Sequence, residues 1–261
     1  MLRSLYTAAT GMDAQQTKMD VIAHNLANAS TTGFKKTRAE FEDLLSETIK
    51  PAGLPQGQGG GSPSPLQVGL GVRTESTTRS FAQGDLQNTQ NPLDVAIQGG
   101  GFLRVQRSNG ELAYTRAGNL RVDAEGRLVT QQGELMQPPV TIPKDATAVT
   151  IQTDGTVLVT MPGKTDPTQA GTIELSVFPN PGGLESLGDN LLTETAASGA
   201  PVNVKPGEQG AGTLSQGFLE TANVKAVEEM IDMITTQRAY EMNSKVIQTA
   251  DQMLQRLTSL R

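Results

Sequence analysis

Apolar side chains recur at alternating steps of three and four residues through the first 32 positions, where Gly11 is the only helix-breaking residue. This series predicts a helix whose apolar seam packs lengthwise on other helices. Its members are Leu2, Leu5, Ala9, Met12, Gln16, Met19, Ala23 and Leu26. Asn28 and the run from Ser30 to Gly33 are expected to end the helix, because these residue types favour caps, turns and positive φ.

The last 41 residues, 221–261, contain neither Gly nor Pro and predict a second long helix. Its seam repeats every seven residues, with further apolar residues at the interleaved positions. The repeating and interleaved residues are Met233, Tyr240, Ile247, Leu254, Ala250 and Leu257. Glu228, Glu229 and Asp232 lie in the first turns, where the helix dipole favours negative charge, and we expect them to form a solvated face.

Between the two helices, the pattern first predicts a short helix over 37–49 and then a break. Phe41, Leu44, Leu45 and Ile49 would share one side of that helix, which Pro51 ends. Residues 51–65 contain nine Gly or Pro in fifteen positions. Such a stretch sustains neither helix nor strand and is expected to be a linker.

From residue 66 to 216 the pattern favours short strands separated by turn residues. Asn109-Gly110 would join strands 102–107 and 112–115, and Asp154-Gly155 would join strands 149–153 and 156–160. Both dipeptides suit a two-residue hairpin turn with positive φ at both central positions. A third hairpin would pair 120–122 with 127–130. No helical periodicity alternates with these strands, which argues against a doubly wound nucleotide-binding fold.

The chain is therefore predicted to be an α+β protein with four parts. The N- and C-terminal helices would form a coiled-coil-like stalk, with an antiparallel sandwich or barrel-like β domain inserted between them. The expected parts are a helix over 1–32, a connecting segment with a Gly/Pro-rich linker over 33–65, a β domain over 66–216 and a helix over 217–261.

The two helices carry few large apolar residues for their length, which suggests that they need more neighbours than each other. We hypothesise that they become ordered by packing on other copies of the chain, in a ring or an open helical filament. The periodicity is equally compatible with a two-helix stalk or with packing on the β domain of the same chain.

Composition then removes several functional classes. The formal net charge is −6 and aromatic residues make up 3%, a poor basis for nucleic-acid binding, so no nucleic-acid partner is expected. Cysteine is absent and His24 is the only histidine, so disulfides, thiol catalysis and cysteine-ligated metals are excluded. We predict no catalytic residue, no metal site and no cofactor.

Three motifs resemble chemical sites but favour structural roles. Gly163-Lys164-Thr165 has the end of a phosphate loop, but the position that needs the first glycine is Leu158. His24 lies four residues after Asp20, which favours a helix surface over a metal site. The acidic groups near residues 40 and 228 resemble glycosidase pairs only in composition, because catalytic pairs lie in clefts that shift their pKa values.

Membrane and targeting signals are also lacking in the pattern. No run approaches about 18 apolar residues, the length of a spanning helix. Polar residues interrupt the first positions too often for a cleaved signal peptide.

Several motifs together resemble the bacterial flagellar rod and hook proteins, over nearly the whole chain. The N-terminal motif is Asn25-Leu26-Ala27-Asn28-Ala29-Ser30-Thr31-Thr32-Gly33-Phe34-Lys35. The C-terminal motif is Gln237-Arg238-Ala239-Tyr240-Glu241-Met242-Asn243-Ser244-Lys245-Val246-Ile247, preceded by Gly217-Phe218-Leu219-Glu220. The middle is similar at Gln83-Gly84-Asp85-Leu86, Asp94-Val95-Ala96-Ile97 and Tyr114-Thr115-Arg116-Ala117-Gly118. Within the family, the length and the segment 66–72 most resemble the members that build the distal rod.

The resemblance implies a non-enzymatic subunit of the flagellar basal body that polymerises in the periplasm into a tubular drive shaft. Export would use the flagellum's own type III apparatus, without a cleaved signal peptide. The implied partners are further copies of the chain, the proximal rod and hook-side proteins and the bushing rings around the rod. No direct insertion into a membrane is implied.

Two sets of residues are predicted to matter for assembly. The seam residues are Leu5, Met12, Met19, Leu26, Met233, Tyr240, Ile247, Leu254 and Leu257. The signature residues, some of which form the bend after the first helix, are Asn25, Asn28, Gly33, Phe34, Gln237, Arg238 and Asn243. A proximal rod or hook-type subunit, a secreted glycan-acting enzyme and a periplasmic binding module remain alternatives.

Overall fold

The structure is a computed structural model that describes residues 2–50, 52, 64–163 and 166–259. A helix lies at each end, α1 (Leu2–Ala27) and α2 (Ala226–Ser259), and antiparallel strands fill the part between them. The predicted helix, β-rich domain and helix are therefore confirmed. Most of the expected linker, and Lys164 and Thr165 of the Gly-Lys-Thr motif, lie outside the described residues.

The chain divides into two compact units. The helical unit comprises the described parts of 1–27, 37–78 and 225–261, and the β unit comprises 28–36 and 79–224. The chain thus passes from one unit to the other four times. The boundary at residue 66, expected from composition, falls inside a paired hairpin, because glycine and proline mark breaks in the chain whereas membership of a unit follows pairing.

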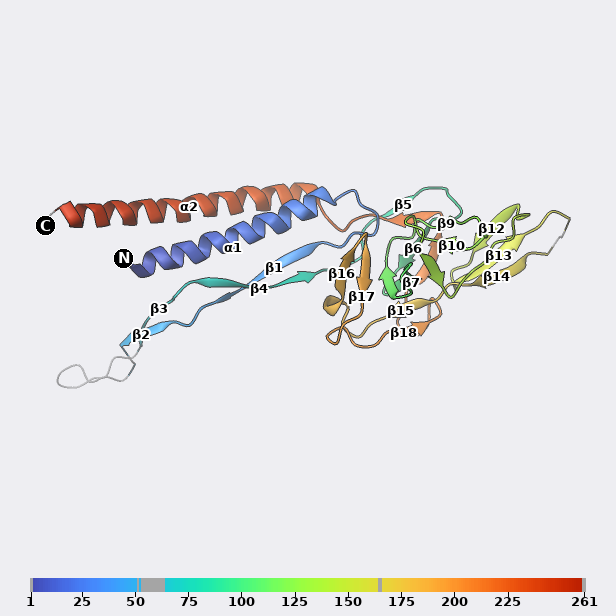
Figure 1. Ribbon diagram of the computed structural model, residues 1–261, viewed down its shortest axis with the longest axis horizontal. Coiled ribbons are helices and arrows are strands. Elements are labelled where there is room, and N and C mark those ends of the chain that lie inside the picture. Colours follow the sequence, from blue (N-terminus) through green and yellow to red (C-terminus); the bar gives the residue numbers. More distant parts are fainter. Residues whose placement is uncertain (1, 51, 53–63, 164–165, 260–261) are drawn as a thin grey trace. The chain divides into compact units, whose positions relative to one another are not determined.

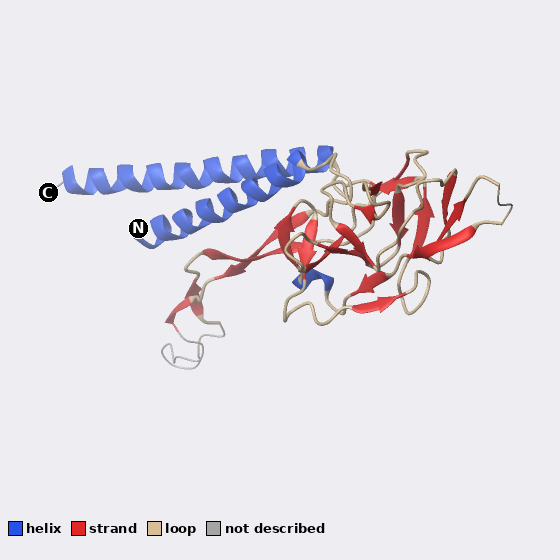
Figure 2. Cartoon of the chain, turned by 45° about the vertical axis from the view of Figure 1, so that its right-hand side comes forward, coloured by secondary structure: helices blue, strands red, loops and turns tan. Residues whose placement is uncertain are grey.

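In the helical unit, α1 and α2 lie side by side in both views (Figures 1 and 2). Two narrow ribbons complete the unit, β1 (Thr37–Asp43) with β4 (Val72–Arg79), and β2 (Glu47–Lys50) with β3 (Leu66–Val68).

The predicted helix over 37–49 is wrong, because that segment forms β1 and β2. Thr37, Ala39 and Phe41 alternate with polar residues, which is the period of a strand. The pairing of β1 with β4, about thirty residues later, decides between this short alternation and the equally short helical stripe.

The described residues of the β unit form sixteen strands, most of them short, and one turn of 3-10 helix (Pro181–Gly183). A nine-stranded sheet has the path β16-β17-β8-β7-β11-β10-β9, with β15 and β18 attached beside β7. Its strands are β7 (Phe102–Gln106), β8 (Leu112–Thr115), β9 (Arg121–Val122), β10 (Leu128–Val129), β11 (Leu135–Gln137), β15 (Leu175–Val177), β16 (Glu185–Gly188), β17 (Leu191–Thr193) and β18 (Val202–Val204).

Smaller sheets complete the β unit. One has the order β12 (Ala148–Ile151), β13 (Thr156–Thr160), β14 (Thr168–Thr172). The others are pairs, β6 (Val95–Gln98) with β19 (Thr213–Gln216), and β5 (Leu86–Asn88) with β20 (Phe218–Glu220). One apolar core contains side chains from the nine-stranded sheet, the three-stranded sheet and β6, including Leu103, Val157 and Ile97.

All three predicted hairpins form, but the two-residue turn expected at Asn109-Gly110 and Asp154-Gly155 is wrong. In each of them only the glycine, Gly110, Gly126 or Gly155, has a positive φ. Gly110 donates its N–H to the carbonyl of Arg107, and Arg107 donates to Glu111. This is a three-residue loop closed by a left-handed glycine, which splays the strands less than a plain type I turn would. The side chain of Asn109 accepts the Glu111 N–H and holds the loop.

Gly118 tests the packing of this unit. A Cβ at this position would lie 1.6 Å from the carbonyl oxygen of Val95, a backbone atom that cannot step aside. We expect Gly118→Ala to lower the free energy of unfolding by about 2 kcal/mol or more, because overpacking a fixed backbone is costly. Urea unfolding followed by circular dichroism measures the effect.

Gly182 provides the matched control. Its nearest neighbour to an added Cβ is the side-chain oxygen of Asn180 at 3.4 Å, an ordinary contact. Gly182→Ala should stay within about 0.5 kcal/mol of the parent. Equal stability of the two variants would contradict the close approach at Gly118.

Candidate functional site

The two helices pair through a row of small and polar residues. Asn25 donates its side-chain N–H to Glu229 at 3.2 Å, and the amide of Asn243 covers Gly11 so closely that a Cβ there would lie 2.9 Å away. Asn25 and Gly11 are two heptads apart on α1, and Glu229 and Asn243 are two heptads apart on α2. The helices therefore run antiparallel in constant register.

The most buried positions of both helices follow this register. On α2 the buried positions are Glu229, Thr236 and Ala250, which fall on one seven-residue spacing together with the partly buried Asn243. On α1 the buried positions are Ala8, Ala14, Ile22 and Asn25. Thr236 and Ala250 each lie three residues after a member of the predicted α2 seam, Met233 and Ile247. This spacing is consistent with the heptad predicted for that helix.

The large residues of the predicted seam border this contact instead of filling it. Met12 follows Gly11 by one residue, which is about 100° around the helix. Seven of the nine predicted residues are partly buried: Leu5, Met12, Met19, Leu26, Met233, Ile247 and Leu254. Tyr240 is 36% exposed, and the side chain of Leu257 is outside the described set. The structure thus leaves their role in assembly a prediction.

A second row of large apolar residues lies exposed along α2. Val227 is 70% exposed, Ile231 56% and Ile234 50%. The full set is Val227, Met230, Ile231, Ile234, Met242, Val246 and Met253. We call these seven residues the exposed α2 face. Isolated exposed apolar residues are ordinary, but a row of this length on one helix indicates a surface for another molecule.

Asn25 joins three elements of the helical unit. Its side chain accepts the Thr37 N–H at 3.0 Å and donates to the Thr37 carbonyl at 2.8 Å, so it pairs with the first residue of β1 as a strand would. The same amide reaches Glu229 in the first turn of α2. Asn25 is 1% exposed. An amide is required here because the position must both donate and accept.

Glu229 corrects one expectation from the sequence. It was expected on a solvated acidic face, yet the side chain is 1% exposed and accepts from Asn25. Its partner lies 204 residues earlier in the chain, so no local pattern could reveal the contact. Glu228 and Asp232 are exposed as expected.

The β unit contains a buried ionic cluster, formed by Lys35, Arg116 and Glu220. The Lys35 ammonium lies 2.6 Å from one oxygen of Glu220, and Arg116 Nε lies 3.1 Å from the other. All three side chains are at most 4% exposed. Gly84 also donates its N–H to Glu220, at 2.9 Å. The carboxylate thus holds two cations and a backbone amide.

Further bonds of the cluster reach neighbouring loops. Lys35 donates to the carbonyl of Ala82 at 2.8 Å, and Arg116 donates to the carbonyl of Gly99. Burial is the largest cause that lowers the pKa of Lys35 from its ordinary 10.5, and burial also lowers the pKa of Arg116. Glu220 opposes both changes, through its hydrogen bonds and its charge. One carboxylate therefore compensates two desolvated cations.

The predicted bend residues lie around this cluster. Gly33 has φ +71° and donates its N–H to the Glu220 carbonyl at 2.8 Å. A Cβ at Gly33 would lie 2.7 Å from the backbone nitrogen of Ala117, so the position requires glycine on two grounds. Phe34 is buried, and the Asn28 carbonyl accepts the Thr31 N–H in the preceding turn.

Asn223 adds a second polar tie in the β unit. It accepts the Lys36 N–H at 2.7 Å and donates to the carbonyls of Ser80 and Ala82. Lys36, Ser80 and Asn223 each lie within two residues of a point where the chain leaves the β unit. The exits are therefore held together by polar bonds inside this unit.

Sequence reasoning had missed Lys35, Arg116 and Glu220 as a group, although each stands in a motif that carried the family resemblance. Lys35 ends the N-terminal motif, Arg116 lies in the middle one and Glu220 precedes the C-terminal one. The sequence signal for this cluster is that each of these three motifs contains a single charged residue beside apolar residues and a glycine. Of the other signature residues, Gln237 and Arg238 are exposed, and Asn243 contacts Gly11.

Nothing in the described residues resembles a catalytic centre. No group of three or more His, Cys, Asp or Glu side chains that could hold a metal is found there. Glu40 accepts from Arg38 and Thr78, and these bonds lower its pKa, the opposite of what a general acid needs. Among the same residues, no helix combines the length and hydropathy of a membrane span.

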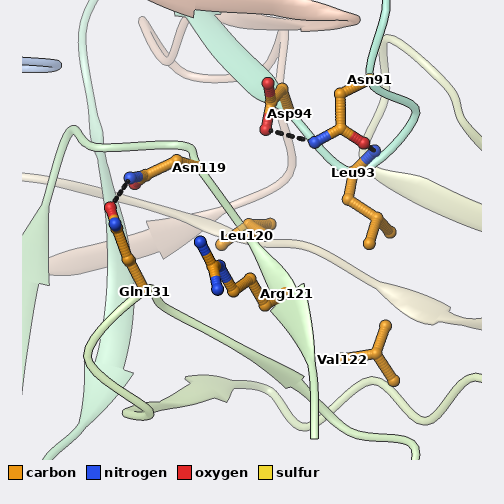
Figure 3. A pocket seen from close by; sticks show the side chains of 8 residues that line it. All are labelled: Asn91, Leu93, Asp94, Asn119, Leu120, Arg121, Val122 and Gln131. Carbon is orange, nitrogen blue, oxygen red and sulfur yellow. Dashed lines mark hydrogen bonds between the residues drawn. The ribbon is translucent and has the colours of Figure 1, made fainter.

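The β unit also has a hollow of about 430 Å³ beside β9. Figure 3 shows its polar walls, with Asn91 bonded to Asp94 and Asn119 bonded to Gln131. These amides are paired with neighbours in the chain. We find no arrangement of acid and base in it.

Comparison with known proteins identifies three matching family descriptions along the chain. Residues 5–35 match "Flagella basal body rod protein", residues 96–159 match "Flagellar hook protein FlgE/F/G D1 domain", and residues 215–260 match "Flagellar basal body rod FlgEFG protein C-terminal". These three ranges contain the motifs that carried the resemblance at each end and, in the middle, the motif Tyr114-Thr115-Arg116-Ala117-Gly118.

Whole proteins give the same result. The chain is 51% identical over 261 residues to the flagellar basal-body rod protein FlgG of Caulobacter vibrioides, and 49% identical over 260 residues to that of Buchnera aphidicola from Acyrthosiphon pisum. Both matches cover 100% of each chain. The flagellar hook protein FlgE of Helicobacter mustelae is 44% identical over 138 residues, which is 52% of this chain and 30% of that protein.

Asn25 provides a direct test of the helical unit. Asn25→Ala should destabilise this unit by about 1–3 kcal/mol, because it leaves buried backbone groups of Thr37 without a partner. Asn25→Asp should cost at least as much, since it loses the donor and sets a second carboxylate beside Glu229. Amide hydrogen exchange in the first turns of α2 measures the change.

Gln16→Ala serves as the control, because Gln16 is exposed on α1 and alanine favours a helix. It should leave exchange in α2 unchanged. Parent-like protection in Asn25→Ala would show that the junction does not depend on this amide.

Glu220→Gln tests the ionic cluster. The substitution preserves the shape but leaves Lys35 and Arg116 as buried cations without a counter-charge. We expect a loss of about 3–5 kcal/mol in unfolding free energy, as for other buried pairs that lose one partner. In contrast, Glu125→Gln removes one side of the exposed pair with Arg127 and should cost about 1 kcal/mol or less. Urea unfolding compares the two variants; equal midpoints would refute the role of the cluster.

Proposed function

The chain belongs to the family of flagellar basal-body rod proteins, which are structural and non-enzymatic, and we propose that it self-assembles into the distal rod that transmits torque to the hook. The distal position is supported by full-length similarity to FlgG proteins, together with only partial similarity to a hook protein. A proximal rod or hook-type subunit remains the second candidate.

The exposed α2 face is the observation that carries self-assembly. Pairing of α1 with α2 in one chain uses Asn25, Glu229 and Asn243 and leaves seven large apolar residues of α2 at least 44% exposed. Fully burying such a side chain stabilises an assembly by about 1.5–3 kcal/mol. Copies packed lengthwise through these residues would gain most of their stability from each other.

We further propose that the predicted seam contributes to the same contacts. The seam residues flank the pairing of the two helices. They are Leu5, Met12, Met19 and Leu26 on α1 and Met233, Tyr240, Ile247 and Leu254 on α2. Leu257 would extend the row. Coiled-coil-like packing between copies would use these residues, since they continue the heptad on both helices.

The β unit would form a sandwich-like domain on each subunit. Support comes from the shared core of the nine-stranded and three-stranded sheets, to which Leu103 and Val157 both contribute. Close-packed cores of this kind resist compression, which suits a shaft under torque.

We propose partners and a location by analogy with the family. The rod would bind the proximal rod at one end and hook-side proteins at the other, and the bushing rings would surround it. The type III export apparatus of the flagellum would deliver the subunit to the periplasm without a cleaved signal peptide.

A charge on the exposed α2 face separates assembly from folding. Ile231 is 56% exposed, so Ile231→Asp should change the stability of the isolated chain by no more than about 0.5 kcal/mol. In cells that lack the native protein, we expect it to abolish rods and swimming. Ile247→Asp also blocks assembly in this scheme, but Ile247 is partly buried, so folding is affected as well.

Gln248→Asp introduces the same charge at an exposed polar position of the same helix and should support rods and motility. Electron microscopy of basal bodies and swimming in soft agar are the measurements. Wild-type motility in Ile231→Asp would rule out this face as the assembly surface.

A further inference from the structure

The nine-stranded sheet of the β unit ends at three strands within the described residues: β16 and β9 at the two ends of its path, and β18 on the side branch beside β15. Its path begins at β16 and finishes at β9, so within the described residues each of these strands has a strand partner on one side. Open sheet edges present unpaired backbone groups and pair readily with another chain. β16 and β9 lie at opposite ends of one path, so a contact between them requires two copies.

The hydrogen-bond pattern defines the open side of β9. Leu128 of β10 stands opposite Val122, but its N–H donates to the Val140 carbonyl. The flanking residue Asp123 does donate to Arg127 across the hairpin. Hydrogen-bonded and non-hydrogen-bonded pairs alternate in an antiparallel ladder, so the N–H and C=O of Val122 point away from β10. They are available to a further strand.

Space beside β9 matches this geometry. Val122 and Leu93 line both the hollow of about 430 Å³ in Figure 3 and a second hollow of about 330 Å³, which Ile142 and Lys144 also line. Val122 therefore stands between two open hollows. Upstream, the bridge between Asp94 and Asn119 covers the edge, so the accessible stretch begins after Asn119.

The other end of the sheet has complementary side chains. β16 is exposed along its four residues and pairs with β17 on its inner side. β16 carries the acidic residue Glu185 and β9 carries the basic residue Arg121, and both side chains are exposed. Neither has an ion-pair partner among the described residues. Leu187 and Val122 are each 39% exposed, so each edge offers one apolar side chain beside its charge.

We propose that β9 of one copy pairs with β16 of the next, which joins the sheets of neighbouring subunits into a continuous head-to-tail array. The contact is heterologous and generates a ring or an open filament. It rests on the proposed self-assembly, to which it adds a second contact. Both strands are short, so it supplies register and direction, while the helices supply most of the stability.

Disulfide trapping tests the pairing directly, because the chain contains no cysteine of its own. Val122→Cys is combined with Ser186→Cys in one variant and with Leu187→Cys in another. Successive residues of a strand face opposite sides, so one of the two pairs lies on the face of residue 122 whichever register forms. Residues directly opposite each other in paired strands have Cα atoms within the 4.4–6.8 Å that a disulfide needs, so these variants test the registers that set residue 122 opposite 186 or 187.

Basal bodies isolated from cells with each variant are mildly oxidised and run on non-reducing gels. We expect a ladder of linked subunits from one double variant and monomers from each single variant. Rods that form normally without a ladder in either double variant would overturn the sheet contact at these registers and leave rod function intact. Linked dimers from Val122→Cys alone would overturn the head-to-tail arrangement, since β9 would then meet β9.

Charge reversal gives an independent measurement. Arg121→Glu and Glu185→Arg should each reduce the yield of rods about tenfold, because like charges would face each other across the contact. The double variant should recover to within about twofold of the parent. Absence of recovery, with each single variant impaired, would overturn the pairing of these two residues. Absence of rods in the unmodified chain would overturn the proposed function itself.

Discussion

The pairing of α1 with α2 through small and polar residues is the constraint on which the helical unit depends. Asn25 bonds to Glu229 and Asn243 covers Gly11, so the helices approach closely at small and polar residues, while Ile22 is the large apolar side chain buried on α1. The apolar residues of α2 are thereby left for other molecules. A pair of helices with its leucines and isoleucines turned inward would be a stable monomer with little reason to assemble. Here, instead, seven large apolar residues of α2 are exposed, which suits a subunit of a rod.

Buried polar networks stand at the points where the chain passes between the two units. In the helical unit, the side chain of Asn25 bonds to the backbone N–H and carbonyl of Thr37 and to Glu229 of α2. In the β unit, Glu220 holds Lys35 and Arg116, and Asn223 ties the segments around Lys36 and Ser80. Such networks contribute less to net stability than apolar packing, because desolvation offsets much of the attraction. Their value is directional, since each bond fixes one geometry. A subunit that transmits torque benefits when the segments at which the chain leaves each unit have a fixed geometry.

The β unit shows how a sheet can be stable and still offer contacts. Its core is closed by apolar residues of two sheets, while the path of the larger sheet ends at two short exposed strands. Short and charged edges protect soluble proteins from uncontrolled pairing. Arg121 and Glu185 have opposite signs, which disfavours pairing of like edges and favours one head-to-tail combination. Specific assembly and protection from aggregation thus rest on the same residues.

The sequence alone determined the features that depend on local periodicity. The heptads predict both helices, Asn109-Gly110 and Asp154-Gly155 mark two hairpins, and the terminal motifs identify the family. Short-range patterns could not decide whether 37–49 is helix or strand, because the decision belongs to its pairing with a distant segment, β4. They predicted the wrong turn type, since the preference of a dipeptide for positive φ yields to the closure of a three-residue loop. Only the tertiary structure buries Glu229 and gathers Lys35 with Glu220, residues separated by 185 positions in the chain. Such long-range contacts produce no periodic pattern in the sequence. The partner of each charged residue lies far away in the chain, so the residues next to it in sequence do not reveal the pair.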